Sequence, residues 1–280
     1  MNNSKKNIYA LLDFDGFICK SYFANKEDMT NIESAKIILN DLKNSAIEKT
    51  ANYFGVDKSS VIVAPIMSGH SWKKDLYPSY KRTRARDEFL GLYREEIKKD
   101  RGIVFVNNLE ADELLIVIHQ YLRALNIKHI IFSDDKDLKY YATDYCKINI
   151  TEEPELLDEV AMWSRQLEQM IAGDSEDNIK GIPKIGMKTA EKILTNTGYS
   201  IESVIREYKS RDIDIDSCLR DLLLIIPMSE DYIDNTETIY KLALDVLENN
   251  KELYDIDANN AIISQVQFLN KKVTEVYNEI

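Results

Sequence analysis

The sequence contains few cysteines, histidines, prolines and glycines, and each shortage narrows the class of protein. Its three cysteines and three histidines form no CxxC pair and no zinc-ligand spacing, so we expect reduced thiols and no zinc site. No run of 18 apolar residues and no signal peptide occur, which argues against a membrane or secretory protein. Five prolines and nine glycines in 280 residues favour a helix-rich globular protein with one large or two medium domains.

Net positive charge is also lacking. The formal net charge is −12, which is unusual for a protein that binds nucleic acid. Segment 72–101 is the exception, because it holds ten lysines and arginines against six acids, with five aromatic residues between them. Lysine and arginine bind phosphates, and aromatic rings stack on bases. The segment therefore indicates a nucleic-acid contact, while a solvated helix surface would show the same charges.

Short apolar runs alternate with helical patterns in the first half of the chain. Helical spacing covers 31–54 and 111–125, and it continues from about 155 to the C-terminus. Strands are expected at five places: 8–12, 60–66, 102–106, 129–132 and 146–150. An alternating order of strands and helices is typical of an α/β fold with a mainly parallel sheet.

Acidic residues gather where three of these strands end, and a fourth group precedes a glycine turn. Carboxyl ends of parallel strands meet at one edge of a sheet, where clustered carboxylates repel each other unless a cation lies between them. Mg²⁺ or Mn²⁺ suits such oxygen ligands, and two ions about 4 Å apart support phosphodiester hydrolysis. Capping of a helix would also explain the acids at 110–113. The four groups are Asp13 and Asp15; Glu110, Asp112 and Glu113; Asp135 and Asp137; Asp174 and Asp177.

Five motifs of this sequence resemble, in order, those of the 5′-nuclease family: flap endonucleases, phage 5′–3′ exonucleases and the 5′-nuclease domains of bacterial DNA polymerase I. The resemblance covers about residues 8–200, and its most specific motif is Gly173–Ala190. The other four are Asp13 with Lys20–Ala24; Trp72-Lys73 with Tyr80–Arg84; Glu110–Glu113; and Ser133–Asp137.

This resemblance implies a fold and a domain organisation. The expected nuclease domain, residues 1–165, has a PIN-like, mainly parallel central sheet flanked by helices, with a helical arch at about 72–106. The expected second domain, residues 166–280, is a helical DNA-binding region. It carries a helix–hairpin–helix (H3TH) motif at about 171–195.

The implied activity is Mg²⁺- or Mn²⁺-dependent hydrolysis of DNA near 5′ ends or at flaps in replication or repair, with RNA-primer removal as a further use. Asp13, Asp135 and Lys81 would be central to catalysis, with Lys81 stabilising charge on the transferring phosphate. Two ions are expected. The first would be held by Asp13, Glu110, Asp112 and Asp135, and the second by Glu113, Asp137, Asp174 and Asp177.

The resemblance also assigns the DNA contacts. Lys20, Lys73 and Arg84 would clamp phosphates, and Tyr80 would stack on a base. The turn that includes Gly181, Lys184, Gly186 and Lys188 would bind duplex phosphates without reading sequence, and its carbonyls could hold a K⁺ ion. We expect a cytoplasmic monomer of phage or bacterial origin.

One departure and three alternatives remain open. Ile66 stands where the family usually carries a further metal-site aspartate, so a non-catalytic DNA-binding descendant is one alternative. A haloacid-dehalogenase-like phosphatase would use Asp13 as nucleophile and Asp15 as general acid, but it needs neither the glycine turn nor the basic segment. A PIN-type ribonuclease shares the acidic sheet but lacks the glycine turn.

Overall fold

The computed structural model describes residues 8–25, 32–82, 87–100, 102–135, 138, 146–148, 159–228, 236–248 and 254–279. These residues form two compact units. The sheet unit comprises Met1–His70, Arg86–Leu156 and Glu237–Ala258, and the helical unit comprises Ser71–Ala85, Leu157–Thr236 and Asn259–Ile280. The basic segment 72–101 is thus shared between the two units.

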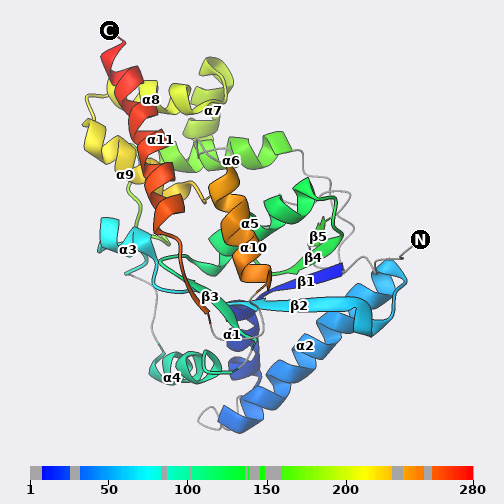
Figure 1. The fold of residues 1–280 in the computed structure, drawn as a ribbon. Coiled ribbons are helices and arrows are strands. Elements are labelled where there is room, and N and C mark those ends of the chain that lie inside the picture. The colour runs from blue at the N-terminus through cyan, green and yellow to red at the C-terminus, as the bar shows by residue number, and fades with distance from the viewer. Residues whose placement is uncertain are drawn as a thin grey trace. The chain divides into compact units, whose positions relative to one another are not determined.

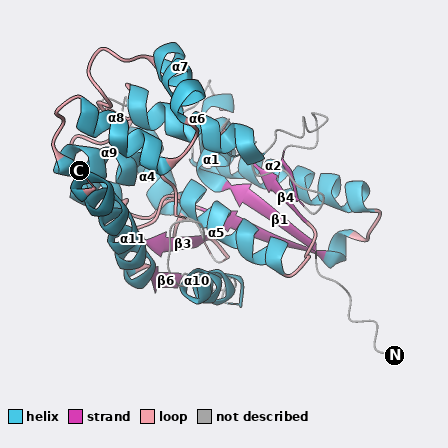
Figure 2. Ribbon diagram, turned by 90° about the horizontal axis from the view of Figure 1, so that it is seen from above, coloured by secondary structure: helices cyan, strands magenta, loops and turns pink. Residues whose placement is uncertain are grey.

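The sheet unit is built on six strands in the order β5-β4-β1-β2-β3-β6, and all the pairings between them are parallel. Strands β4 and β1 of this sheet lie side by side in Figure 2. This confirms the predicted α/β class. The strands are β1 (Ile8–Asp13), β2 (Val61–Ile66), β3 (Val104–Asn107), β4 (His129–Phe132), β5 (Cys146–Ile148) and β6 (Tyr254–Asp257).

Helices cover both faces of the sheet, which is why its inner strands are almost continuously apolar. Helices α1 (Phe14–Ala24) and α2 (Ile32–Phe54) lie on one face, and α5 (Ala111–Ala124) and α10 (Thr236–Glu248) lie on the other (Figure 1). The main core cluster joins β1 and β4 to α1, α2 and α4 (Glu88–Ile97). A short 3₁₀ helix, η1 (Lys58–Ser60), leads into β2.

Strand β6 was not expected, because the sequence after about 155 was predicted to be entirely helical. It pairs with β3, with Val104 opposite Tyr254. The segment is only four residues long and contains two aspartates, a residue type that is depleted in strands. The pairing therefore depends on a long-range contact with β3 that no local pattern reveals.

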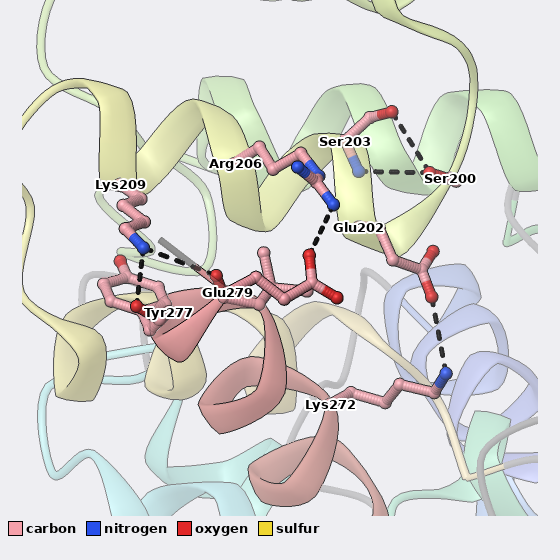
Figure 3. A network of polar contacts seen from close by, with 9 residues as sticks. Ser200, Glu202, Ser203, Arg206, Lys209, Lys272, Tyr277 and Glu279 are labelled. Carbon is pink, nitrogen blue, oxygen red and sulfur yellow. Dashed lines mark hydrogen bonds and ion pairs between the residues drawn. The ribbon is translucent and has the colours of Figure 1, made fainter.

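The helical unit consists of α3 (Trp72–Leu76), α6 (Glu159–Ala172), α7 (Met187–Thr197), α8 (Ile201–Ser210), α9 (Ile215–Ile225) and α11 (Asn259–Asn278). Figure 3 shows how polar side chains join α8 to α11: Arg206 pairs with Glu279 at 2.6 Å, and Lys272 pairs with Glu202 at 3.4 Å. Lys209 donates to the carbonyl of Tyr277 at 2.5 Å. The last helix is therefore part of this unit's own packing.

Among the described residues, no helix combines the length and the apolar character needed to span a membrane.

Candidate functional site

The chain reverses its direction of travel across the sheet between β1 and β4, which are neighbours although they are far apart in sequence. Ligands of open parallel sheets bind outside the carboxyl ends of the strands at such a switch point. Asp13 is the last residue of β1, and Ser133 directly follows β4. The fold thus brings two of the predicted acidic groups to one place.

Ser133 connects these two groups. Its hydroxyl donates to Oδ2 of Asp13 at 2.6 Å and accepts from the backbone N–H of Asp135 at 3.0 Å. Burial raises the pKa of Asp13, the bond from Ser133 opposes that rise, and the nearby charges of Asp15 and Asp135 add to it. A cation between these carboxylates would relieve both the repulsion and the cost of burial.

Asp15, whose role the sequence left undefined, joins three elements. Its Oδ2 accepts from the backbone N–H of Ser68, just after β2, at 3.0 Å. Its Oδ1 forms an ion pair with Arg94 on α4 at 2.7 Å. Ser68 in turn accepts, through its Oγ, from the backbone N–H of Ala111 at 3.0 Å. Asp15 therefore holds α4 and the loop after β2 beside the switch point.

The third acidic group lies at the start of α5. The side chain of Glu113 is fully buried, and its Oε2 accepts from the backbone N–H of Glu110 at 3.2 Å. Asp112 Oδ1 accepts from the backbone N–H of Glu113 at 2.8 Å. These are contacts of a helix N-terminus, which favours negative charge, so the capping explanation applies to this group.

Across the described ranges, no three Asp, Glu, His or Cys side chains are grouped so that they could hold a metal ion. Predicted site residues Arg84 and Asp137 lie outside the described residues. Asp174 and Asp177 belong to the helical unit. Within the sheet unit, hydrogen bonds join Asp13 to Asp135 through Ser133. At the start of α5 they join Glu113 to Glu110 and to Asp112.

The predicted glycine turn is present in the helical unit, and its glycines have different roles. Gly181 is buried at φ +58°, and a Cβ there would lie 2.2 Å from the backbone nitrogen of Gly173. Two crossing segments of this chain therefore require a glycine at this position, and its role as a DNA contact stays a prediction. Gly186 is exposed and precedes α7, with Lys184 and Lys188 exposed beside it.

Two further predicted DNA contacts are buried. The ring of Tyr80 is 3% exposed and packs against Ile179 and Leu224. Lys73 is 4% exposed, and the DNA-binding roles of both residues stay predictions. Aromatic and basic residue types alone do not distinguish a core position from an interface.

Lys81 and Lys20 belong to different units. Lys81 Nζ lies 3.9 Å from Oδ2 of Asp177, in the helical unit. Lys20, on α1 of the sheet unit, is largely exposed and pairs with Asp134 at 2.6 Å. An exposed pair of this kind contributes little stability, and the role of Lys20 as a phosphate clamp stays a prediction.

Sequence reasoning missed the contributions of Ser133 and Arg94 to the site. Ser133 stood inside a motif that was chosen for its acids, and its place directly after a strand was the available signal. Arg94 was counted only as one of ten bases in the segment 72–101. Its pairing with Asp15 joins positions 79 residues apart in the printed sequence, and no local pattern predicts such a contact.

Several known proteins are similar to this chain. It is 27% identical to the 5′–3′ exonuclease of Mycoplasmopsis pulmonis, over 76% of this chain and 74% of that protein. It is 24% identical to the 5′–3′ exonuclease of Buchnera aphidicola subsp. Baizongia pistaciae, over 98% and 91%.

Among solved structures, a complex of the bacteriophage T5 flap endonuclease with DNA and metal ions matches 98% of this chain and all of that chain. Its TM-score is 0.55 and its sequence identity 16%, which is a likeness of fold. No protein-family model matches this sequence.

Proposed function

We propose, because the chain belongs to the 5′-nuclease family, that it hydrolyses DNA phosphodiester bonds near 5′ ends or at flaps, with the help of divalent metal ions. The observation that carries this proposal is the link from Asp13 through Ser133 to Asp135 at the switch point of a parallel sheet. A buried carboxylate with a second acid close by is suited to hold a cation.

Asp13 and Asp135 would hold Mg²⁺ or Mn²⁺, with the acids at the start of α5 as further candidates. The raised pKa of Asp13, caused first by burial and then by the charges of its neighbours, supports a cation at this edge. Such ions, when bound, lower the pKa of water and offset negative charge on a phosphate. Asp174 and Asp177 remain candidates for a second ion.

The other named residues would bind and orient DNA. Lys81 would offset the charge that develops on the transferring phosphate. Lys20, Lys184 and Lys188 would contact phosphates, and the exposed backbone at Gly186, where α7 begins, would receive a duplex phosphate. Contacts to phosphates carry no sequence information. We therefore expect recognition of DNA structure rather than base sequence, and the turn carbonyls are also our proposed place for a K⁺ ion.

The test is cleavage of a 5′-flap DNA in Mg²⁺ by the unmodified protein, Asp135→Asn and Lys81→Ala. We expect both variants to lose at least about a hundredfold in rate, since each removes a charge from the proposed chemistry. Asp216→Asn and Lys241→Ala, at exposed positions, are matched controls that should cut normally. Undiminished cutting by Asp135→Asn and Lys81→Ala would refute the mechanism.

Ile66 supports a second candidate, a DNA-binding protein without nuclease activity. This side chain is fully buried and stands opposite Asp13 in the register of β1 and β2. It cannot supply the oxygen ligand that the family usually has at this place. Binding of flap DNA without cutting, in either Mg²⁺ or Mn²⁺, would favour this candidate over the first.

The phosphatase alternative has less support. A general acid at Asp15 would have to exchange protons with a leaving group, yet Asp15 is paired with Arg94 and accepts from Ser68. Hydrolysis of a small phosphomonoester that disappears in Asp13→Asn would restore this alternative.

A further inference from the structure

Two loops of the helical unit are fastened together, and one of them carries Lys81. The first is the turn 77–82 that follows α3, and the second is the loop 174–179. The backbone N–H of Lys81 donates to the carbonyl of Asp177 at 3.0 Å, and Nδ2 of Asn178 donates to the carbonyl of Ser79 at 3.0 Å. Both contacts act on the main chain, so they fix the path of the backbone that carries Lys81.

Tyr80 anchors the turn from its other side. Its ring is buried against Ile179, which belongs to the second loop, and against Leu224 of α9. The ammonium of Lys81 lies 4.9 Å from the centre of the same ring, a distance at which a cation is attracted to an aromatic face. Lys81 is therefore held by its main chain, by a ring and by the carboxylate of Asp177.

The backbone angles of Lys81 and Asn178 also indicate that Lys81 is held in place by its surroundings. Lys81 has φ +54° and Asn178 has φ +59°, a region that lysine rarely adopts and asparagine adopts more readily. A left-handed lysine persists only where surrounding contacts hold it. Here these contacts are the main-chain bond to Asp177 and the side-chain bond from Asn178 to Ser79.

We infer that Asn178 and Tyr80 are positioning residues for Lys81. They fix its ammonium beside Asp177, so that this lysine belongs to the same unit as the glycine turn. The inference rests on the proposed function, in which Lys81 acts on the transferring phosphate. Its consequence is that Lys81 is already in place before the glycine turn binds the duplex, so DNA binding needs no separate ordering of the turn 77–82.

Asn178→Gly tests the inference, because glycine accepts φ +59° and removes only the bond to Ser79. We expect the single-turnover cleavage rate on flap DNA to fall at least about tenfold, as for a misplaced reacting group. Affinity for the same DNA in Ca²⁺ should change less than twofold. Asn126→Gly is the matched control, because Asn126 also has a positive φ, +55°, and lies after α5 in the sheet unit.

A double-mutant cycle shows whether the effect passes through Lys81. In a Lys81→Ala background, Asn178→Gly should cause no further loss of rate. If the losses of cleavage rate caused by Asn178→Gly and Lys81→Ala multiply in the double variant, the inference is overturned. An unreduced cleavage rate in Asn178→Gly alone would also overturn it. Tyr80→Leu, which removes the ring from Ile179, should behave like Asn178→Gly, whereas Tyr80→Phe should restore the rate.

Amide hydrogen exchange gives a readout that is independent of cleavage. The N–H of Lys81 should be protected in the unmodified protein, and it should exchange at least about tenfold faster in Asn178→Gly. Unchanged exchange would overturn the positioning role, whether or not the protein is a nuclease. Absence of cleavage by the unmodified protein would refute the proposed function alone and leave the exchange result to decide the role of Asn178.

Discussion

The hydroxyl of Ser133 donates a 2.6 Å hydrogen bond to Oδ2 of Asp13, joining the end of β4 to the end of β1. The two residues are 120 positions apart in sequence. Because the same hydroxyl also accepts from the N–H of Asp135, one small side chain sets the distance between two acids of the proposed site.

Ser133→Ala should weaken binding of divalent ions without unfolding the protein. The orientation of Asp13 and the backbone of Asp135 would both lose a hydrogen bond, and partners of this kind typically account for about 10–100-fold in metal affinity. Titration calorimetry with Mn²⁺ measures the effect. Ser210→Ala, which removes a hydroxyl bonded to Glu207 on α8, should bind Mn²⁺ normally. An unchanged affinity in Ser133→Ala would show that Asp13 needs no such support.

Acid should destabilise the sheet unit through a buried pair of histidines. His119 Nδ1 and His129 Nε2 lie 2.9 Å apart between α5 and β4. Burial lowers the pKa of His129 from 6.5 to about 4 and lowers that of His119 well below 6.5. Both are therefore neutral when folded, and the charges of His129 and Arg123 add to the effect of burial in lowering the pKa of His119.

Because the unfolded chain binds protons near pH 6.5 and the folded chain does not, this contribution to stability is complete above pH 6.5. It is lost as the pH falls towards 4, by about 1–3 kcal/mol for His129. Urea unfolding at several pH values measures how the free energy of unfolding depends on pH. His129→Gln should flatten the dependence of unfolding free energy on pH. An equal slope in the unmodified protein and in His129→Gln would contradict the prediction.

Two glycines of the same turn should respond differently to alanine. Gly181→Ala forces a methyl group against the backbone of Gly173 at a positive φ, so we expect a loss of more than about 2 kcal/mol in unfolding free energy. Gly186→Ala meets no atom within 4 Å and should fold normally.

DNA binding should separate these two variants. Gly186→Ala should weaken duplex binding at an unchanged melting temperature, because its methyl group stands where a phosphate would approach. In Gly181→Ala, any loss of binding should follow the loss of stability. Full duplex affinity in Gly186→Ala would exclude this position from the DNA interface.

Arg94→Ala should destabilise the sheet unit by about 1–2 kcal/mol, since it leaves the partly buried carboxylate of Asp15 without its ion-pair partner. Adding Asp15→Asn to Arg94→Ala should recover part of the lost unfolding free energy, because the uncompensated carboxylate is then removed. Lys99→Ala, which breaks an exposed pair with Glu96, is the control and should unfold like the unmodified protein. Urea titrations of the unmodified protein, Arg94→Ala, Asp15→Asn and the double variant measure the coupling, and purely additive effects would argue against it.

The sequence predicted most of the sheet because its strands are buried on both faces and therefore apolar throughout. The runs 8–12 and 129–132 became β1 and β4, and the helical spacing of 31–54 became α2. Strand β6 could not be predicted, since its pairing partner is about 150 residues away and its own composition disfavours a strand.

Prediction of the site was less complete, for a physical reason. Acids at strand ends are recognisable because topology alone brings them to one edge, as Asp13 and Asp135 show. Burial is not recognisable in the same way. The burial of Tyr80 and Lys73 was not predicted, because the packing of α3 and its following turn depends on distant residues such as Leu224. Roles for Asp174 and Asp177 in metal binding stay predictions.

The order in which the two units share the chain limits how the protein can be shortened. The sheet unit takes its edge strand β6 from a segment that follows α9, and the helical unit takes α11 from the segment after that. Any truncation that removes α11 damages the helical unit, and one that ends after α9 also removes an edge of the sheet. A fragment meant to carry only one unit would therefore need a rearranged chain order, with two or more segments rejoined by new linkers.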